Sequence, residues 1–94
     1  MRKYEVMFII RTDIEQESQQ NLVEKVQGII ASEGSVTKLD VLGKRRLAYE
    51  IDKYRDGVYV LVHFEASQAG IKELDRVLRI SDEVIRHLIV SDVA

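Results

Sequence analysis

Cysteine is missing from all 94 positions of the sequence. Its absence excludes disulfides, thiolate metal sites, iron–sulfur clusters and cysteine nucleophiles, and it fits a reducing cytoplasm. The sequence also has no apolar run that approaches the length of a membrane span, and the charged opening, Met1–Glu5, is unlike a signal peptide. We therefore expect a cytoplasmic protein that neither spans a membrane nor loses an N-terminal segment.

An excess of positive charge is also missing. The formal net charge is −2 and the sequence pI is about 5.7, which argues against nucleic-acid binding through a broad positive field. Any nucleic-acid site must therefore be local. The length and the 46% hydrophobic content predict one domain over residues 1–94, with a modest core and little room for a buried active site.

Residue patterns typical of catalytic and metal sites are absent as well. The segment after the first predicted strand, Arg11–Ile14, has no glycine with which to cradle a phosphate. The two histidines, His63 and His87, lie in predicted strands without an adjacent serine or paired carboxylate, so we interpret them as histidines at the sheet surface. The sequence predicts no enzyme, no metal site and no cofactor.

Period-two alternation and β-forming residues predict four strands. The second is unusually long and has an imperfect pattern, which predicts a bulge near Lys38 or Asp40. Residues 52–57, which end in an Asp-Gly pair, are predicted to form the turn of a hairpin between the second and third strands. The predicted strands cover residues 4–10, 36 to beyond 49, 58–64 and 84–90.

Two helices are predicted between these strands. Thr12 and Asp13 offer N-cap oxygens with Glu15 at capping-box spacing, and Gly34 is predicted to end the first helix in a left-handed conformation. Ser67 is the predicted N-cap of the second helix. The apolar stripes at helical spacing are Leu22, Val26, Ile29 and Ile30 in the first helix and Ile71, Leu74 and Leu78 in the second.

The predicted order, βαββαβ, is the split β-α-β arrangement called ferredoxin-like, an α+β fold. It places two helices on one face of a four-stranded antiparallel sheet, with the first and third strands in the middle. The other face is open, and its central residues are too apolar to be left in water, so it is either a partner surface or is covered by long side chains from the sheet edges. Alternation predicts on this face Glu5, Met7, Ile9, Tyr59, Leu61 and His63.

Three consecutive cations, Lys44–Arg46, run directly into an apolar alternating strand within the stretch Gly43–Ile51. Arginine suits bidentate phosphate contact, but charged residues also protect edge strands as solvated side chains, and both interpretations remain open. In Asp56–Phe64, Val58 and Val60 stand where an RNA-recognition module would stack aromatics on bases. Any RNA contact is therefore expected through phosphates at the rim, with Arg45 on the strand face opposite Lys44 and Arg46.

Three segments, Met1–Glu5, Gly43–Ile51 and Asp82–Arg86, resemble the bacterial small-subunit ribosomal protein S6 family, and the likeness covers essentially the whole chain. The resemblance implies a non-enzymatic structural protein of the small ribosomal subunit. It implies that the protein binds the central domain of small-subunit ribosomal RNA as a heterodimer with ribosomal protein S18. The implied RNA-binding residues are Arg2, Lys44, Arg45, Arg46 and Arg86. Strand alternation adds the expected partner-binding residues Glu5, Met7, Ile9, Tyr59 and Leu61.

Two departures from the family pattern concern the hairpin. Family members often have proline in place of Glu50 and a basic or small polar residue in place of Asp52, so we expect an altered hairpin with binding retained. The long acidic tail of some members is not expected after Ala94. The alternative hypothesis is a ferredoxin-like interaction or ligand-sensing module that assembles through its open sheet face.

Overall fold

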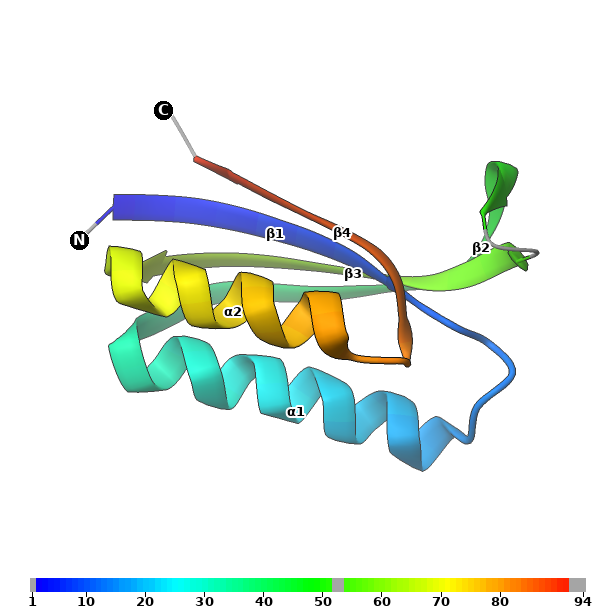
Figure 1. Cartoon of the computed structure of the whole chain (residues 1–94), viewed down its shortest axis with the longest axis horizontal. Coiled ribbons are helices and arrows are strands. Elements are labelled where there is room, and N and C mark those ends of the chain that lie inside the picture. Colours follow the sequence, from blue (N-terminus) through cyan, green and yellow to red (C-terminus); the bar gives the residue numbers. More distant parts are fainter. Residues whose placement is uncertain (1, 52–53, 92–94) are drawn as a thin grey trace.

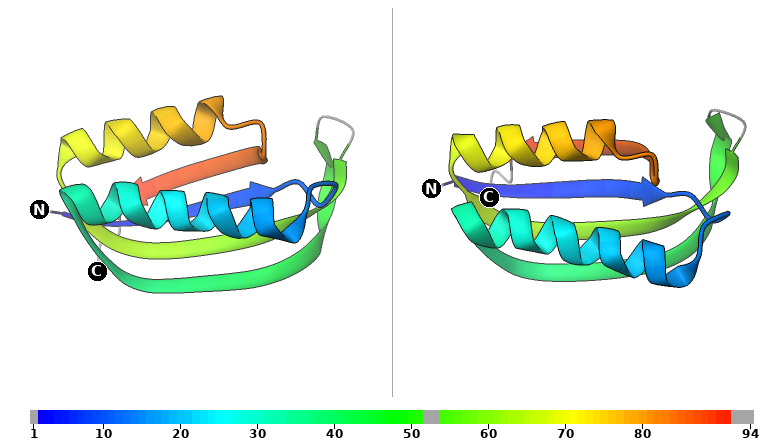
Figure 2. Two further views of the ribbon diagram at one scale, coloured as in Figure 1. Left: turned by 90° about the horizontal axis from the view of Figure 1, so that it is seen from below. Right: turned by 60° about the horizontal axis from the view of Figure 1, so that its bottom comes forward.

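Six elements follow one another in the computed structural model, which describes residues 2–51 and 54–91. The strands form one sheet in the order β2-β3-β1-β4, and every neighbouring pair is antiparallel. Both helices cover the same face of this sheet (Figures 1 and 2), so the predicted ferredoxin-like fold is confirmed. The elements are β1 (Arg2–Ile10), α1 (Gln16–Glu33), β2 (Gly34–Ile51), β3 (Tyr54–Ala66), α2 (Gln68–Ile80) and β4 (Val84–Ser91).

The core lies between the sheet and the two helices. Alternate residues of the central strands β1 and β3 point into it, as predicted, and they meet the apolar stripes of α1 and α2. Burial of one such side chain stabilises the fold by about 1.5–3 kcal/mol. The largest fully buried side chains are Val6, Phe8, Ile10, Val26, Ile30, Val60, Val62, Phe64, Leu74 and Leu78.

The predicted capping box of α1 is wrong. The helix begins at Gln16 after Glu15, and no side chain caps its first turn. The hydroxyl of Thr12 donates a hydrogen bond to Asp56 (2.8 Å), and the carboxylate of Asp13 accepts two from Arg11 (2.8 and 2.9 Å). Both predicted caps are therefore engaged outside the helix.

Ser67 caps α2 as predicted, because its Oγ accepts a hydrogen bond from the backbone N–H of Gly70 (3.3 Å). Gly34, in contrast, is not a left-handed helix end. Its φ of 174° is an extended conformation, and it begins β2. Glycine is needed there because a Cβ atom would collide with the backbone oxygen of Glu65 on the neighbouring strand.

Strand β2 is irregular, as predicted, and its pairing with β3 shifts register between Val36 and Lys38. A second shift precedes Gly43, which has a positive φ of 86°. The predicted turn over 52–57 is wrong for residues 54–57, since β3 already begins at Tyr54. The part of that prediction on Asp52 and Lys53 lies outside the described residues, as do the side chains of Ala48, Glu50 and Ile51.

Gly57 therefore belongs to β3 rather than to a turn. It is buried, and a Cβ atom at this position would collide with the side chain of Ile9 on β1. The residue is glycine because Ile9 occupies that space. In the part of the chain that the structure describes, neither helix has the length and apolar character needed to cross a membrane.

Candidate nucleic-acid and partner interface

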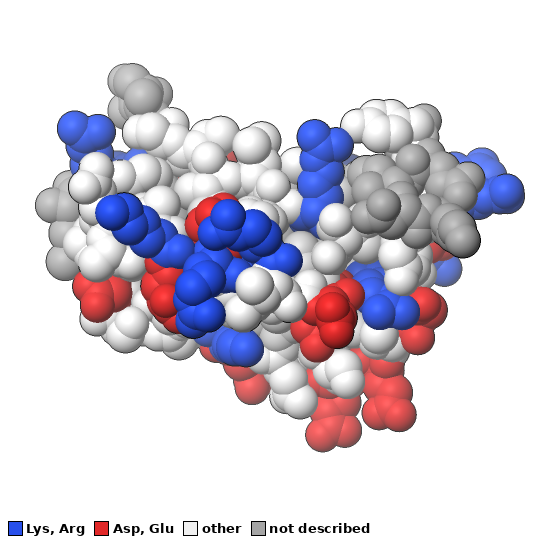
Figure 3. Space-filling model, in the orientation of Figure 1, with Lys and Arg blue, Asp and Glu red and all other residues white. Residues whose placement is uncertain are grey.

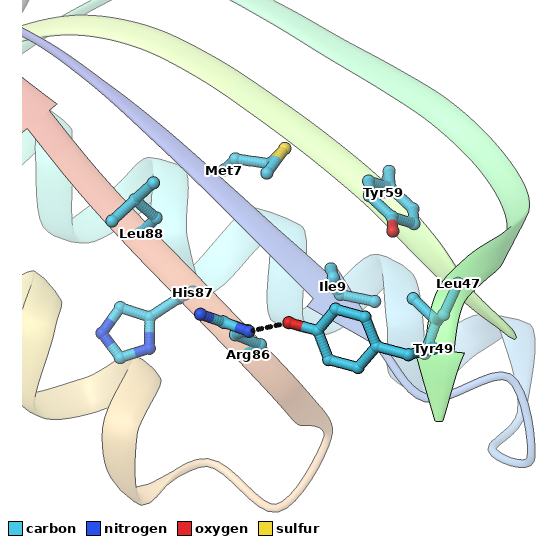
Figure 4. A pocket seen from close by; sticks show the side chains of 8 residues that line it. All are labelled: Met7, Ile9, Leu47, Tyr49, Tyr59, Arg86, His87 and Leu88. Atoms are coloured by element: carbon cyan, nitrogen blue, oxygen red, sulfur yellow. Dashed lines mark hydrogen bonds between the residues drawn. The ribbon is translucent and has the colours of Figure 1, made fainter. Parts of the chain in front are cut away.

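The open face of the sheet carries an apolar groove with a volume of about 360 Å³ (Figure 4). Its floor is formed by Met7 and Ile9 of β1 and Tyr59 of β3. Residues from the two edge strands complete it: Leu47, Tyr49, Arg86, His87 and Leu88. All four strands of the sheet thus contribute residues to one groove.

The five predicted partner-binding residues lie side by side on this face. Met7 of β1 pairs with Leu61 of β3, and Ile9 pairs with Tyr59. Glu5 precedes Met7 by two residues and therefore lies on the same side of β1. All five belong to the two central strands. Their role in partner binding stays a prediction.

One hydrogen bond crosses the groove between its two edges. The guanidinium of Arg86 on β4 donates to the hydroxyl of Tyr49 on β2 at 2.9 Å, above the central strands (Figure 4). Ile9 is only 5% exposed. At this end of the open face, long side chains from the two edge strands therefore do fold over the sheet.

Beyond this bridge the open face remains accessible. Leu88 is 57% exposed and Val90 is 41% exposed, and both lie on the same side of β4 as Arg86. Sequence reasoning missed these two residues, although alternation within Val84–Ser91 was a signal that could have placed them. The exposed apolar area thus extends from the groove along the β4 edge.

The predicted RNA-binding cations do not form one cluster. Arg86 lies at the groove and the cations of β2 lie at the hairpin end, but Arg2 begins β1 at the opposite end of the sheet (Figure 1). Arg2 is paired with Ala66, while Lys44 is paired with Val58. The eight-residue offset along β3 corresponds to roughly 26 Å at the usual rise of a strand.

A shallow groove at the hairpin end gathers Lys44, Arg45, Arg46, Arg55 and Asp56. The ammonium of Lys44 lies 3.4 Å from one carboxylate oxygen of Asp56, and the hydroxyl of Thr12 donates to the other oxygen. The hydrogen bond from Thr12 and the charge of Lys44 lower the pKa of Asp56 below its usual value. Sequence reasoning missed Arg55, because it placed this residue in the turn and not opposite the cationic stretch.

Charge is unevenly distributed over the surface. Figure 3 shows positive side chains at the hairpin end and over α2, while acidic side chains gather on the lower side, where α1 lies. A negative net charge is therefore compatible with a local cationic surface.

The two histidines lie next to acidic residues of neighbouring elements. The ring of His87 is 2.8 Å from a carboxylate oxygen of Asp75 on α2, which joins β4 to that helix. His63 lies on the open face, opposite Glu5. Within residues 2–51 and 54–91, no group of three or more acidic or histidine side chains could hold a metal ion.

Comparisons with known proteins identify relatives along the whole chain. A family model described as "Ribosomal protein S6" matches residues 3–91. The small ribosomal subunit protein bS6 of Moorella thermoacetica is 53% identical over 90 residues, covering 95% of this chain and 92% of that protein. The protein of the same name from Desulforamulus reducens is 50% identical over 93 residues, covering 98% of both chains.

A solved structure agrees with these sequence matches. The crystal structure of 30S ribosomal protein S6 from Thermotoga maritima superposes with a TM-score of 0.91 at 36% identity. The match covers 96% of this chain and 86% of that chain. Sequence and fold thus point to the same set of relatives.

Proposed function

The chain belongs to the ribosomal protein S6 family, and from this premise we propose that it binds small-subunit ribosomal RNA as a heterodimer with ribosomal protein S18. Members of the family are structural ribosomal proteins and not enzymes. The protein is accordingly a structural constituent of the small ribosomal subunit in the bacterial cytoplasm. The RNA contact is with the central domain.

The observation that carries the proposal is the apolar groove on the open sheet face, with Arg86 at its rim. An accessible apolar surface on a soluble domain is typical of a protein interaction site. S18 is the proposed occupant of this surface, which includes the partner-binding strip Glu5, Met7, Ile9, Tyr59 and Leu61. Because Ile9 lies under the Arg86–Tyr49 bridge, its contribution to the interface requires that bridge to open.

The cations beside this surface supply the RNA contact. Arg45 and Arg46 lie at the hairpin end beside Lys44, and Arg86 lines the apolar groove. Protein phosphate contacts of this kind position a nucleic acid without reading its bases. Since the chain has a net negative charge, its own cations provide only part of the positive surface, and S18 provides the rest.

Sedimentation of tagged protein with small ribosomal subunits at increasing salt tests the ribosomal role. We expect co-sedimentation that persists at physiological salt and is lost progressively above it, because phosphate contacts weaken as counterions compete. Loss already at low salt would contradict the proposal. If the same protein then formed a stable homo-oligomer without recovered RNA, the interaction-module alternative would be favoured instead.

A further inference from the structure

The cations of the hairpin end fall into two groups that the sequence does not distinguish. Lys44 is paired with Asp56 at 3.4 Å. Arg45, Arg46 and Arg55 are exposed, and among the described residues none of the three has an acidic side chain within ion-pair distance. Arg45, Arg46 and Arg55 thus share one groove with Lys44, and of these four cations only Lys44 has an acidic partner among the described residues.

The register of β2 and β3 explains why Arg46 has no acidic partner among the described residues. Asp56 lies directly opposite Arg46 and would be its natural cross-strand partner. Its two carboxylate oxygens are instead engaged by Thr12 and by Lys44. Lys44 therefore holds the acidic side chain of the groove away from Arg46.

The same register brings Arg55 next to Arg45. Arg45 lies opposite Gly57, and Arg55 precedes Gly57 by two residues on the same side of β3. The two arginines are therefore diagonal neighbours across the strand pair, within reach of long side chains. Arg46 lies on the other face of β2, so the groove is lined by residues from both faces of this strand. A nearby cation on the β1 side, Arg11, is occupied by two hydrogen bonds to Asp13 and takes no part in this group.

We propose, on the basis of the RNA-binding function above, that Arg45, Arg46 and Arg55 form a groove for the RNA phosphate backbone, with Lys44 as a positioning residue that keeps Asp56 out of it. Like charges in one groove repel each other, and a bound phosphate relieves that repulsion. Arginine forks bind phosphate oxygens bidentately. Arg55 is thus an RNA-binding residue outside the consecutive cations of β2.

The occupant is RNA and not S18 because of where the groove lies. The apolar groove proposed for S18 is lined by residues of all four strands, including Leu47 and Tyr49 of β2, but it shares no lining residue with the groove of the arginines. The groove has charged side chains at every lining position, which suits a phosphate backbone and offers little to an apolar partner.

The test is a set of RNA-binding titrations with the S18 heterodimer across a range of salt. Arg55→Gln is expected to weaken RNA binding about tenfold. It should also reduce the slope of log affinity against log salt concentration by about one, which corresponds to the loss of one phosphate contact. The matched control is Lys25→Gln, an exposed cation on α1 that changes the net charge equally and should leave binding unchanged. If the Arg55→Gln and Lys25→Gln heterodimers bound RNA equally well while the wild-type heterodimer also bound RNA, the groove proposal would be overturned, but the proposed RNA-binding function would stand.

The positioning role of Lys44 has its own readout. Lys44→Gln should weaken RNA binding, because the carboxylate oxygen of Asp56 that Lys44 engages becomes available to Arg46, while Thr12 still holds the other oxygen. Asp56→Asn keeps an acceptor for Thr12 but removes the charge, so the Lys44→Gln, Asp56→Asn double variant should regain wild-type affinity. No recovery in the double variant would show that Lys44 itself contacts phosphate. If the wild-type heterodimer failed to bind RNA, the proposed function itself would be refuted. If Arg55→Gln lost binding to S18 but kept binding to RNA, the groove would be assigned to the protein partner.

Discussion

At the scale of single residues, two glycines show how packing decides whether a position can accept a side chain. A Cβ atom at Gly57 would collide with the side chain of Ile9 on the neighbouring strand. At Gly28 on α1, no atom lies within 4 Å of the position that a Cβ would take. Both are glycines inside a regular element, yet only Gly57 is required by its surroundings. This contrast leads to a paired prediction.

Gly57→Ala is expected to destabilise the protein by about 1–3 kcal/mol, since the added methyl group displaces Ile9. Gly28→Ala should instead stabilise it by about 1 kcal/mol, because alanine is the better helix former and the space is open. Chemical denaturation of both variants measures the free energy of unfolding. Equal effects of the two substitutions would contradict the packing described for Gly57.

Asp75 also acts at the residue scale. Its carboxylate is 2.8 Å from the ring of His87 and 3.2 Å from the guanidinium of Arg79, and the hydrogen bond to His87 is the main cause that lowers its pKa. A carboxylate with a lowered pKa in the folded state stabilises the protein above its unfolded-state pKa of 3.8. That stabilisation is lost as the pH falls through the folded-state value.

Asp75→Asn should therefore reduce the free energy of unfolding at neutral pH by up to about 1 kcal/mol, because the pair is partly exposed. The difference from wild type should vanish below the folded-state pKa of Asp75. Denaturation between pH 2 and 7 measures this, with Glu24→Gln on the exposed side of α1 as the control. A difference that persists unchanged at the acidic end would rule out the charged pair as its source.

At the scale of elements, regular patterns were predictable and connections were not. Period-two alternation in β1 and β3 identified the core side and the open side, because those strands have neighbours on both edges and a fixed register. The turn after β2 was misplaced, since local Asp-Gly chemistry suggested a turn where cross-strand pairing keeps Asp56 and Gly57 in the sheet. Thr12 and Asp13 failed as helix caps for a similar reason, since their partners are tertiary or lie outside the helix.

The candidate site shows the same limit. The sequence identified Met7, Tyr59 and the consecutive cations, all of which follow from strand alternation or composition. It could not reveal the Arg86–Tyr49 bridge, whose residues are 37 positions apart, nor the exposure of Leu88 on an edge strand. These features depend on the order of strands in the sheet.

Strand β4 provides a prediction at the element scale. Leu88→Glu should prevent heterodimer formation with S18, because it places a charge in the proposed apolar interface while the side chain is exposed enough to leave the fold intact. Ile80→Glu is the matched control, as Ile80 is an exposed apolar residue at the end of α2, on the helix side of the sheet. Size-exclusion chromatography of the two variants with S18 separates the outcomes. Heterodimer formation by both variants would place the interface elsewhere.

At the scale of the whole molecule, two properties that look inconsistent are explained together. The chain is acidic overall, yet its hairpin end carries arginines that have no acidic partner among the described residues. Its open sheet face carries an apolar groove. Both properties are expected under the proposal that the protein binds RNA as one half of a heterodimer. In the proposed heterodimer, the partner covers the apolar face and adds positive charge, while this chain contributes the proposed phosphate groove.

The affinity of small-subunit central-domain RNA for the protein alone and for its heterodimer with S18, at one fixed salt concentration, tests this account most directly. We expect weak binding by the protein alone and binding at least about a hundredfold tighter by the heterodimer, with a steeper salt dependence because more phosphate contacts form. Equal affinity and equal salt dependence with and without S18 would contradict the account.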